Sequence, residues 1–376
     1  MILIIHLIVD IRTIDEKRSG IGQYTESYIR NLLYRYPNDF SIIGITDKKN
    51  KLVESLIKDL GIEVIEYGKK VFRSITIFKY FSFVKSEILK RNPDIFWEPN
   101  NIFPHSLKNK NTKLLVTIHD IFPITFPSSY SFKYRFYFKH AVRKTINNAD
   151  KIITVSQKTK YDIEKVFGNK KISVIYNIIN FEPNFMSISD EIYQDDFFLF
   201  LGNFEYRKGV YLLLPAYEQY LENGGKNSLF IAGNINREKK ARFFLNKFIE
   251  KYPNKIKIFG YIDEKVKWQL LNSKRCIAFV FPSLAEGFGT PPLEALFSGR
   301  KVIVSNIPIF KEILEDFPIY FEIENDVMNS IKNLSKALFK SETLNKSPNN
   351  FFEYLNNKFS TEKLIDEFAT ELKKEW

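Results

Sequence analysis

The stretch from Cys276 to Gly299 constrains the fold more than any other part of this 376-residue chain. It opens with CIAFVFP, a short apolar run rich in aromatic and branched residues, which predicts a buried β-strand. The loop SLAEGFGT follows, and its glycines allow a tight turn whose backbone can approach a ligand closely. Thr290 is expected as the N-cap of a helix that runs to about Ser298 and is stopped by Gly299. A strand, a glycine loop and a helix in this order predict one repeat of an α/β domain.

The same stretch contains the parts of a site for a nucleotide-linked sugar. Amide groups at a helix start, with the helix dipole behind them, bind anions such as phosphate. Glu286 lies in the loop and Glu294 lies in the helix, and carboxylates accept hydrogen bonds from sugar hydroxyls. Phosphate-binding amides between two hydroxyl-binding carboxylates favour a nucleotide sugar. By spacing alone, a plain surface turn with two glutamates is an equally good interpretation.

Alternating apolar strands and helices continue through both halves of the chain, which predicts an α/β protein with two Rossmann-like domains. Strands are expected at residues 2–9, 41–46, 63–67, 93–97, 114–118, 150–156 and 172–176, and then at 197–202, 228–233, 256–261, 276–282 and 302–305. Residues 181–196 are the expected linker, so the domains are placed at 1–185 and 186–356. A helix is expected within residues 316–346, and a last one within 357–376, with Ser360 as its N-cap.

Charge is distributed unevenly between the two halves. Residues 1–185 hold 30 Lys and Arg against 18 Asp and Glu, while the rest of the chain holds 26 of each. The whole excess of +12 therefore belongs to the first domain, which predicts an anionic partner for that domain alone.

Composition also bounds the setting of the protein. The single cysteine, Cys276, excludes a disulfide framework and is expected to be a small buried hydrophobe. The four histidines show no metal-ligand spacing. The opening MILIIHLIV lacks the basic region and the cleavage site of a signal peptide, and no run is apolar enough to span a membrane. A cytoplasmic protein is expected, at most bound to a membrane surface.

Three further places combine glycine or charge with the end of a strand. Gly20 and Gly22 lie in a predicted loop after the first strand, where glycine permits close approach to a ligand. His119 follows the strand 114–118 at its carboxyl end, which faces the ligand crevice of an open α/β sheet. Arg207 and Lys208 follow the strand 197–202 and suit a diphosphate. Taken alone, each has an ordinary alternative: a plain turn, a histidine satisfied within its loop, and a solvated basic turn.

Together these segments resemble the GT-B glycosyltransferases of family 4, a retaining family. The resemblance is carried by the E-x7-E pair of Glu286 and Glu294 with its PSL, EGFG and PPLEA neighbours, by the G-x-x-x-x-R-K loop that starts at Gly202, and by the segments GIGQYT and VTIHDIFPITFP. It covers nearly the whole chain but is faint over residues 48–90. The chain departs from the family at residues 177–180, where an Asn-Gly-(Ile/Val)-Asp turn is usual, so no ligand contact is assigned there.

The resemblance implies two domains facing a cleft, with the acceptor on the first domain, the donor on the second, and the last helix crossing back to the first. It implies that Glu286 orients the sugar hydroxyls, that Glu294 holds the ribose diol, and that the backbone near Tyr261 receives the nucleobase. The implied catalytic residues are His119, Arg207, Lys208 and Glu286. The implied donor site consists of Gly20, Gly22, Arg207, Lys208, Tyr261, Glu286, Gly287, Phe288, Gly289, Thr290 and Glu294.

A retaining transfer of a hexose from a nucleoside diphosphate sugar to a hydroxyl is therefore expected. GIGQYT and VTIHDIFPITFP look most like segments of bacterial polysaccharide mannosyltransferases, which favours GDP-mannose over a UDP- or dTDP-sugar. No cofactor and no metal ion are expected, because the Arg207 and Lys208 cations and the helix amides neutralise the diphosphate and no Asp-x-Asp is placed to hold a divalent ion.

Two other classes of protein fit the sequence less well. An epimerase or a phosphorylase of the same fold needs different acid–base residues or a pyridoxal-binding lysine motif, and neither is found. A nucleic-acid binder explains the positive charge of the first half, but it leaves the cations and carboxylates of the uncharged half unexplained. No nucleic-acid partner is therefore expected.

Residues 130–146 predict a helix that could bind an anionic membrane surface, as a lipid-linked glycan acceptor requires. The face expected to pack on the domain consists of Tyr134, Phe138, Ala141, Val142 and Thr145. The opposite face is basic and carries two aromatic side chains, and it consists of Lys133, Phe136, Tyr137, His140 and Lys144. A solvated basic face with incidental aromatic residues is the alternative interpretation.

Overall fold

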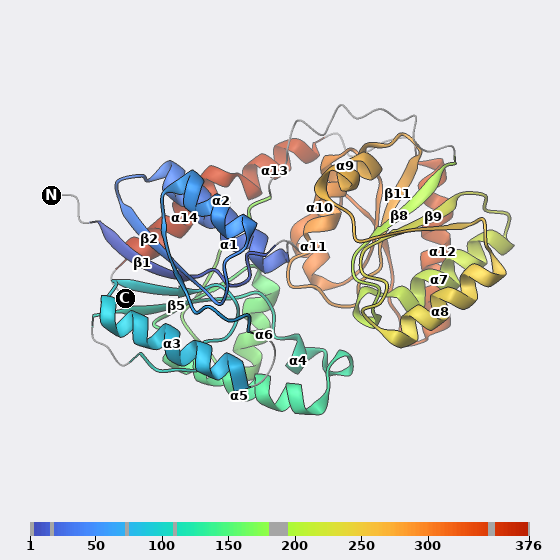
Figure 1. Ribbon diagram of the computed structural model, residues 1–376. Helices are drawn as coiled ribbons and strands as arrows, with labels where there is room; N and C mark the ends of the chain where they lie inside the picture. Colours follow the sequence, from blue (N-terminus) through green and yellow to red (C-terminus); the bar gives the residue numbers. More distant parts are fainter. Residues whose placement is uncertain are drawn as a thin grey trace. The chain divides into compact units, whose positions relative to one another are not determined.

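The computed structural model describes residues 4–15, 19–71, 75–107, 111–179, 195–344 and 350–374. The chain divides into two compact units, Met1–Ile178 with Phe359–Trp376 (unit 1) and Ile179–Lys358 (unit 2), and each is described by itself. Each unit contains one parallel β-sheet (Figure 1). The division falls at residue 178 instead of the expected 185, and most of the expected linker lies outside the described residues.

Unit 1 contains a sheet of seven parallel strands in the order β3-β2-β1-β4-β5-β6-β7. Its central strands are short apolar runs that are buried on both faces, which is typical of parallel sheets covered by helices. Every expected strand of this half is present, with bounds that differ by at most three residues. The strands are β1 (Ile5–Asp10), β2 (Phe40–Thr46), β3 (Glu63–Glu66), β4 (Ile95–Glu98), β5 (Lys113–Ile118), β6 (Lys151–Thr154) and β7 (Ile172–Val174).

Helices cover both faces of this sheet, with α1, α2 and α14 on one side and α3 and α5 on the other (Figure 1). Local caps set several of their ends; for example, the Asn50 side chain accepts the first amides of α2, and Gly61, at φ +66°, ends that helix. The helices are α1 (Gly20–Arg35), α2 (Lys51–Leu60), α3 (Ile75–Arg91), α4 (Phe122–Thr125), α5 (Phe132–Asn148), α6 (Gln157–Phe167) and α14 (Thr361–Lys373).

The last helix, α14, returns to unit 1, and this expectation is confirmed. Its predicted N-cap is also correct, since the Ser360 side chain accepts a hydrogen bond from the amide of the third helical residue. Arg35 of α1 donates hydrogen bonds of 2.5 and 2.8 Å to the two carboxylate oxygens of Asp366. Phe368 packs against Tyr28 of α1, with ring centroids 4.9 Å apart. The apolar face of the helix thus completes the core of the first unit from the other end of the chain.

Unit 2 contains a sheet of six parallel strands in the order β10-β9-β8-β11-β12-β13. The strands are β8 (Phe197–Leu201), β9 (Ser228–Ala232), β10 (Ile256–Gly260), β11 (Cys276–Phe281), β12 (Val302–Ser305) and β13 (Ile319–Phe321). The first five match the predicted strands, whereas β13 lies in a polar stretch for which no strand is predicted. Cys276 is buried as expected, and burial raises the pKa of its thiol to about 12.

The helices α7, α8 and α12 lie on one side of this second sheet, and α9, α10 and α11 lie on the other (Figure 1). The helix expected within residues 316–346 is α12, whereas α8, α9, α11 and α13 are absent from the expectations. The helices are α7 (Val210–Glu222), α8 (Lys239–Lys251), α9 (Glu264–Asn272), α10 (Thr290–Phe297), α11 (Pro308–Leu314), α12 (Val327–Thr343) and α13 (Phe351–Phe359), whose last residue belongs to unit 1.

Each sheet contains one point at which the strand order reverses. In unit 1 this point lies between β1 and β4, and in unit 2 it lies between β8 and β11. Loops that leave two such strands at their carboxyl ends diverge to opposite faces and open a crevice, where open α/β sheets bind their ligands. The segments that follow β1, β4, β8 and β11 are therefore where a functional site is expected.

The exposed face of α5 differs from the prediction. The buried face consists of Phe138, Ala141, Val142, Thr145 and Ile146. Tyr134 was expected on this face but is 41% exposed, because the helix begins at Phe132 and its first turn projects beyond the core. Tyr137 was expected on the exposed face but is only partly exposed, since its ring packs on Phe78 of α3 at 5.9 Å. Among the described residues, no helix is both long and apolar enough to cross a membrane.

Candidate active site

The segments after β8 and β11 meet at the reversal point of the second sheet and bring three predicted site residues together. Arg207 and Lys208 lie in a single 3₁₀ turn, Tyr206–Lys208, and Glu286 lies in the loop before α10. Lys208 Nζ donates to Glu286 Oε1 at 2.6 Å, and Arg207 Nη1 lies 3.4 Å from Glu286 Oε2. Backbone contacts join the same segments, because Leu284 N donates to the Arg207 carbonyl at 2.8 Å and Arg207 Nη1 donates to the Ala285 carbonyl at 2.8 Å.

Burial and mutual charge set the protonation of this cluster. Burial alone would raise the pKa of Glu286, but the Lys208 and Arg207 cations lower it below its ordinary value. Burial lowers the pKa of Lys208 and Arg207 adds to the effect, while Glu286 opposes it. Glu286 is therefore ionised at neutral pH and held by two cations, so it can accept hydrogen bonds but cannot donate a proton.

Helix α10 begins one residue earlier than predicted. Gly289, with φ +102°, occupies the N-cap position, and Thr290 is already helical, so the assignment of Thr290 as N-cap is wrong. Glycine is required here because a Cβ would approach Phe310 Cε1 to 2.8 Å and because side chains disfavour this φ. With glycine as N-cap, no side-chain cap accepts the first amides of the helix. This arrangement suits an anion at the helix start.

Gly209 holds the two cations in place from the other segment. Its φ is +72°, and a Cβ would lie only 1.9 Å from the Pro282 carbonyl oxygen, so no other residue fits without moving the backbone. The turn that carries Arg207 and Lys208 is thereby pressed against the end of β11. Lys208 Nζ also lies over the Phe281 ring, 4.7 Å from its centroid.

Glu294 lies one turn into α10 and is paired with a residue that sequence reasoning missed. Lys267 of α9 donates to Glu294 Oε1 at 2.7 Å and also contacts Glu264 at 2.7 Å. Burial raises the pKa of Glu294, although Lys267 opposes this shift. Lys267 stands six residues beyond Tyr261, and no motif marks it in the sequence. It is found only because α9 and α10 lie on the same side of the sheet.

The remaining predicted donor residues of unit 2 differ in whether their side chains are accessible to a ligand. Tyr261 follows β10 and its side chain is 64% exposed. Phe288 is buried, so only its backbone could contact a ligand, as could that of Gly287 beside it. Among the described residues, no group of three or more His, Cys, Asp or Glu side chains is arranged to hold a metal ion.

His119 belongs to unit 1, where it follows β5 at the carboxyl edge of the sheet, as predicted. Its Nε2 lies 2.9 Å from the Pro99 carbonyl, which can only accept, so Nε2 carries the proton. The ring packs edge-to-face on Tyr24 of α1, with centroids 4.8 Å apart. Burial lowers the pKa of His119 to about 4. The imidazole is therefore neutral at pH 7, and its unprotonated Nδ1 is a hydrogen-bond acceptor.

The two predicted glycines of unit 1 lie in the first turn of α1, so the expectation of a loop is wrong. Ser19 caps this helix and accepts a hydrogen bond from the Gly22 amide. A Cβ on Gly22 would lie 2.2 Å from the Thr13 carbonyl oxygen, so this glycine accommodates the chain's own backbone. A Cβ on Gly20 would meet nothing within 4 Å. Of the two positions, Gly20 is the one that leaves space for a ligand.

A buried ionic cluster that sequence reasoning missed lies at the reversal point of the first sheet. Asp10 ends β1 and Glu98 ends β4, and Arg12 forms ion pairs with both carboxylates. Tyr80 donates to Asp10 Oδ1 at 3.0 Å. Burial raises the pKa of Asp10, and it raises that of Glu98 well above its ordinary value, although Arg12 lowers both. A charged residue at the end of an apolar strand was the available signal, once the two strands were known to be neighbours.

Both halves of the chain are similar to known families of proteins. Residues 26–182 match the family described as Glycosyltransferase Family 4, and residues 183–356 match the family described as Glycosyl transferases group 1. The chain is 27% identical over 225 residues to the O-antigen chain mannosyltransferase RfbU of Salmonella typhimurium, covering 59% of this chain and 60% of the relative. It is 26% identical to the O-antigen chain mannosyltransferase B of Escherichia coli, covering 59% of each. The match thus spans about 60% of the length of these relatives.

Solved structures share the fold over nearly the whole chain. Anabaena HepE in complex with UDP and glucose has a TM-score of 0.71 at 16% identity and covers 98% of this chain and 99% of its own. The sucrose-phosphate synthase of Thermosynechococcus elongatus has a TM-score of 0.73 at 15% identity and covers 98% of each chain. The residue ranges that match the two families follow one another without a gap. The fold of the chain is that of the solved structures just described. The chain therefore belongs to the family 4 glycosyltransferases and has the GT-B fold.

Proposed function

We propose that the protein transfers a hexose from a nucleoside diphosphate sugar to a hydroxyl of a lipid-linked glycan, with retention, and that the donor is GDP-mannose. The observation that carries the proposal is the cluster of Arg207, Lys208 and Glu286 at the reversal point of the second sheet, beside the uncapped start of α10. The mannosyltransferase names of RfbU and its Escherichia coli counterpart support the choice of sugar.

In this proposal, different residues of unit 2 bind the diphosphate, the sugar and the ribose of the donor. Arg207 and Lys208, with the amides at the start of α10, neutralise the diphosphate and stabilise the charge that grows on it as the sugar leaves. Because both cations already contact Glu286, its carboxylate is oriented before a donor arrives. The ionised Glu286 then accepts hydrogen bonds from the sugar hydroxyls, and Glu294, steadied by Lys267, accepts those of the ribose.

The transfer step exchanges one bond of the sugar for another. The bond between the anomeric carbon and the diphosphate oxygen breaks, and its electron pair leaves with the diphosphate. The acceptor oxygen bonds to the anomeric carbon from the same face, and its proton passes to the departing phosphate oxygen. His119 is neutral at pH 7, so in this scheme it contacts the sugar by accepting a hydrogen bond at Nδ1 and takes no proton.

A UDP- or dTDP-sugar is the second candidate donor. HepE, whose fold this chain shares, was solved with UDP and glucose. In this chain the segment after β10, with the exposed Tyr261, is the expected place of the base.

A panel of donors tests both candidates. GDP-mannose should raise the melting temperature of the full-length protein by several degrees at concentrations well above its Kd, and UDP- and dTDP-sugars should raise it less. The Arg207→Ala variant is the matched control and should lose most of the shift with every nucleotide. A larger shift with a UDP-sugar would replace the donor, and no shift with any nucleotide sugar would contradict the proposed function.

Activity should not depend on a metal ion. The positive charges proposed to face the diphosphate are those of Arg207, Lys208 and the α10 amides, which chelators do not remove. Transfer measured in an excess of EDTA should match the untreated rate. A loss of activity on chelation that Mn²⁺ or Mg²⁺ restores would contradict this part of the proposal.

We propose in addition that unit 1 binds the cytoplasmic face of an anionic membrane through α5. The exposed surface of this helix combines large apolar rings with cations: Phe132 is 76% exposed and Phe136 is 61% exposed, and Lys133, Lys139 and Lys144 are exposed beside them. Basic residues near an anionic surface each contribute about 1 kcal/mol, and aromatic rings settle at the level of the headgroups. Tyr134 joins this surface, contrary to its predicted place on the buried face.

Co-sedimentation with liposomes tests the membrane proposal. The wild type should bind vesicles that contain phosphatidylglycerol and should bind neutral vesicles weakly. The double variant Lys133→Glu/Lys144→Glu should lose most of this binding, whereas Lys90→Glu/Lys171→Glu, with the same charge change elsewhere on unit 1, should keep it. Equal binding to both kinds of vesicle, or equal behaviour of the two variants, would overturn the proposal.

A further inference from the structure

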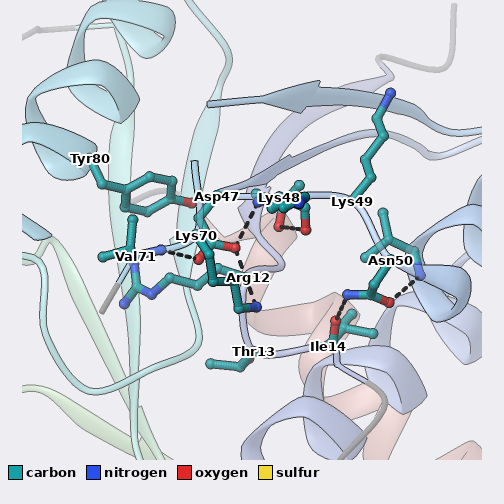
Figure 2. Close-up of polar contacts among 12 residues, drawn as sticks. Arg12, Thr13, Ile14, Asp47, Lys48, Lys49, Asn50, Lys70, Val71 and Tyr80 are labelled. Carbon is teal, nitrogen blue, oxygen red and sulfur yellow. Dashed lines mark hydrogen bonds and ion pairs between the residues drawn. The ribbon is translucent and has the colours of Figure 1, made fainter. Parts of the chain in front are cut away.

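Two loops of unit 1 that are distant in the sequence are joined at the carboxyl edge of its sheet. One follows β2 and the other follows β3 (Figure 2). Asp47 joins them: its Oδ2 accepts from Val71 N at 2.7 Å, its Oδ1 accepts from Lys48 N at 2.7 Å, and its carbonyl accepts from Lys69 N at 3.1 Å. Asn50 ties the first loop to the Ile14 carbonyl at 2.8 Å. Since Asp47 is 2% exposed, it holds the backbone of both loops from their buried side.

The outer surface of these joined loops is strongly basic. It carries the exposed residues Lys48, Lys51, Lys69 and Lys70, and Lys49 points away from Asp47 and Lys70 in Figure 2. Within the described part of the chain, only Lys70 of this set forms an ion pair, with Asp47 at 3.6 Å. The other acidic side chain at these loops, Glu66, accepts the Lys49 amide. Like charges gathered on one surface repel one another, and a bound anion relieves the repulsion.

The start of α2 lies within the same surface but does not supply the anion-binding groups. Asn50 Oδ1 accepts the amides of Leu52 and Val53, at 2.9 and 3.2 Å, so these two donors are already used. Binding would therefore rest on the lysine side chains, which act as mobile point charges and follow a flexible or multiply charged group.

The lysines of these loops are separate from the cations assigned to the diphosphate of the donor. The donor has its own cations in unit 2, Arg207 and Lys208. The lysines occupy the same edge of the first sheet as His119, but β2 and β3 lie three and four strands away from β5. At about 4.8 Å per strand, this places them about 14–19 Å from the end of the His119 strand. An anion at this distance belongs to a part of the acceptor remote from the reacting hydroxyl.

We infer that Lys48, Lys69 and Lys70 form a binding site for the phosphate or diphosphate group of the acceptor. Asp47 holds the two loops that carry these lysines together. The assignment to the acceptor rests on the proposed function, whereas the anion site itself does not. The site also gives the positive charge of the first half a specific role, because the acceptor is held at its phosphate end on these loops and its glycan extends along the carboxyl edge toward His119.

Calorimetric titration with inorganic diphosphate tests the site on the full-length chain. The titration is done on Arg207→Ala/Lys208→Ala, which removes the cations of unit 2 and leaves the loops of unit 1 intact. Adding Lys48→Ala/Lys69→Ala/Lys70→Ala should weaken diphosphate binding on the order of tenfold or more at low salt, since three cations are lost. The matched control adds Lys58→Ala/Lys90→Ala/Lys171→Ala, three exposed lysines at the opposite edge of the same sheet, and should bind as before.

Equal diphosphate affinity in the two triple variants would overturn the site, whatever the outcome of the donor panel. Phosphatidylglycerol vesicles distinguish the source of the phosphate: the Lys48/Lys69/Lys70 variant should bind them as well as the control variant does. If it lost vesicle binding, the lysines would contact lipid headgroups, and their assignment to the acceptor would be overturned.

Discussion

Replacing Arg207 by alanine should lower kcat by about 10²–10³-fold, the cost of removing one preorganised donor that stabilises charge in a transition state. Arg207 contacts both Glu286 and the Ala285 carbonyl, so its loss removes one cation from the diphosphate and loosens the loop that carries the carboxylate. Glu286→Gln should lower kcat to a similar extent, because a neutral amide accepts hydrogen bonds from sugar hydroxyls more weakly than a carboxylate does. Steady-state kinetics at saturating donor measure both effects.

Arg237→Ala is the matched control for this prediction. Arg237 is exposed and pairs with Glu205, which also pairs with Arg207, but Arg237 makes no contact with Glu286 in the described structure. Its removal should leave kcat within a few-fold of the wild type. All three variants should remain folded by circular dichroism, since Lys208 still neutralises Glu286 when Arg207 is removed. Near wild-type turnover of Arg207→Ala or Glu286→Gln would show that the residue has no part in transfer.

The free energy of unfolding should fall as the pH is lowered from about 6.5 to 4, with a contribution of about 3 kcal/mol from His119 alone. Burial lowers the pKa of His119 from its ordinary value of 6.5 to about 4, so between these values the unfolded chain binds a proton that the folded chain does not. Stability therefore rises with pH through this window and levels off above it. Urea unfolding of the wild type and of His119→Gln at pH 4.5, 5.5 and 7 measures the effect.

The wild type and His119→Gln differ in their free energy of unfolding, and the way this difference changes with pH reports on His119. The buried carboxyls Asp10 and Glu98 have raised pKa values and act in the opposite sense, gaining stability on protonation, but they are common to both proteins. His140→Gln, at an exposed position of α5, is the control for replacing a histidine by glutamine. A stability difference between wild type and His119→Gln that does not vary with pH would show that His119 titrates normally in the folded state.

What the sequence by itself determined depends on near neighbours in the chain. Short apolar runs between polar segments located twelve of the strands, because the strands of a parallel sheet are buried on both faces. Ser360 was identified as an N-cap because capping involves residues only three apart. Arg207, Lys208, Glu286 and Glu294 were singled out because they lie after a predicted strand or early in the helix that follows, and the resemblance to family 4 favoured a functional role over ordinary turns. Arg207, Lys208 and Glu286 meet because their segments leave neighbouring strands at one carboxyl edge. β13 was missed because its three residues lie in a polar stretch.

Tertiary structure decided what depends on contacts between distant segments. Gly22 is a glycine because the Thr13 carbonyl passes over it, and Gly289 is one because Phe310 lies against it, neither of which a local pattern contains. Tyr134 is exposed because the core ends before the first turn of α5, which periodicity along one helix cannot show.

The same reason applies to the charged groups that the sequence did not reveal. Lys267 contacts Glu294 across two helices, and Arg12 joins Asp10 to Glu98 across two neighbouring strands whose residues lie 88 positions apart. Asp47 brings Lys48 beside Lys69 and Lys70 from the next strand. Charges interact through space, so their pairing and their pKa values follow from strand order and burial, which the fold sets and the linear sequence does not contain.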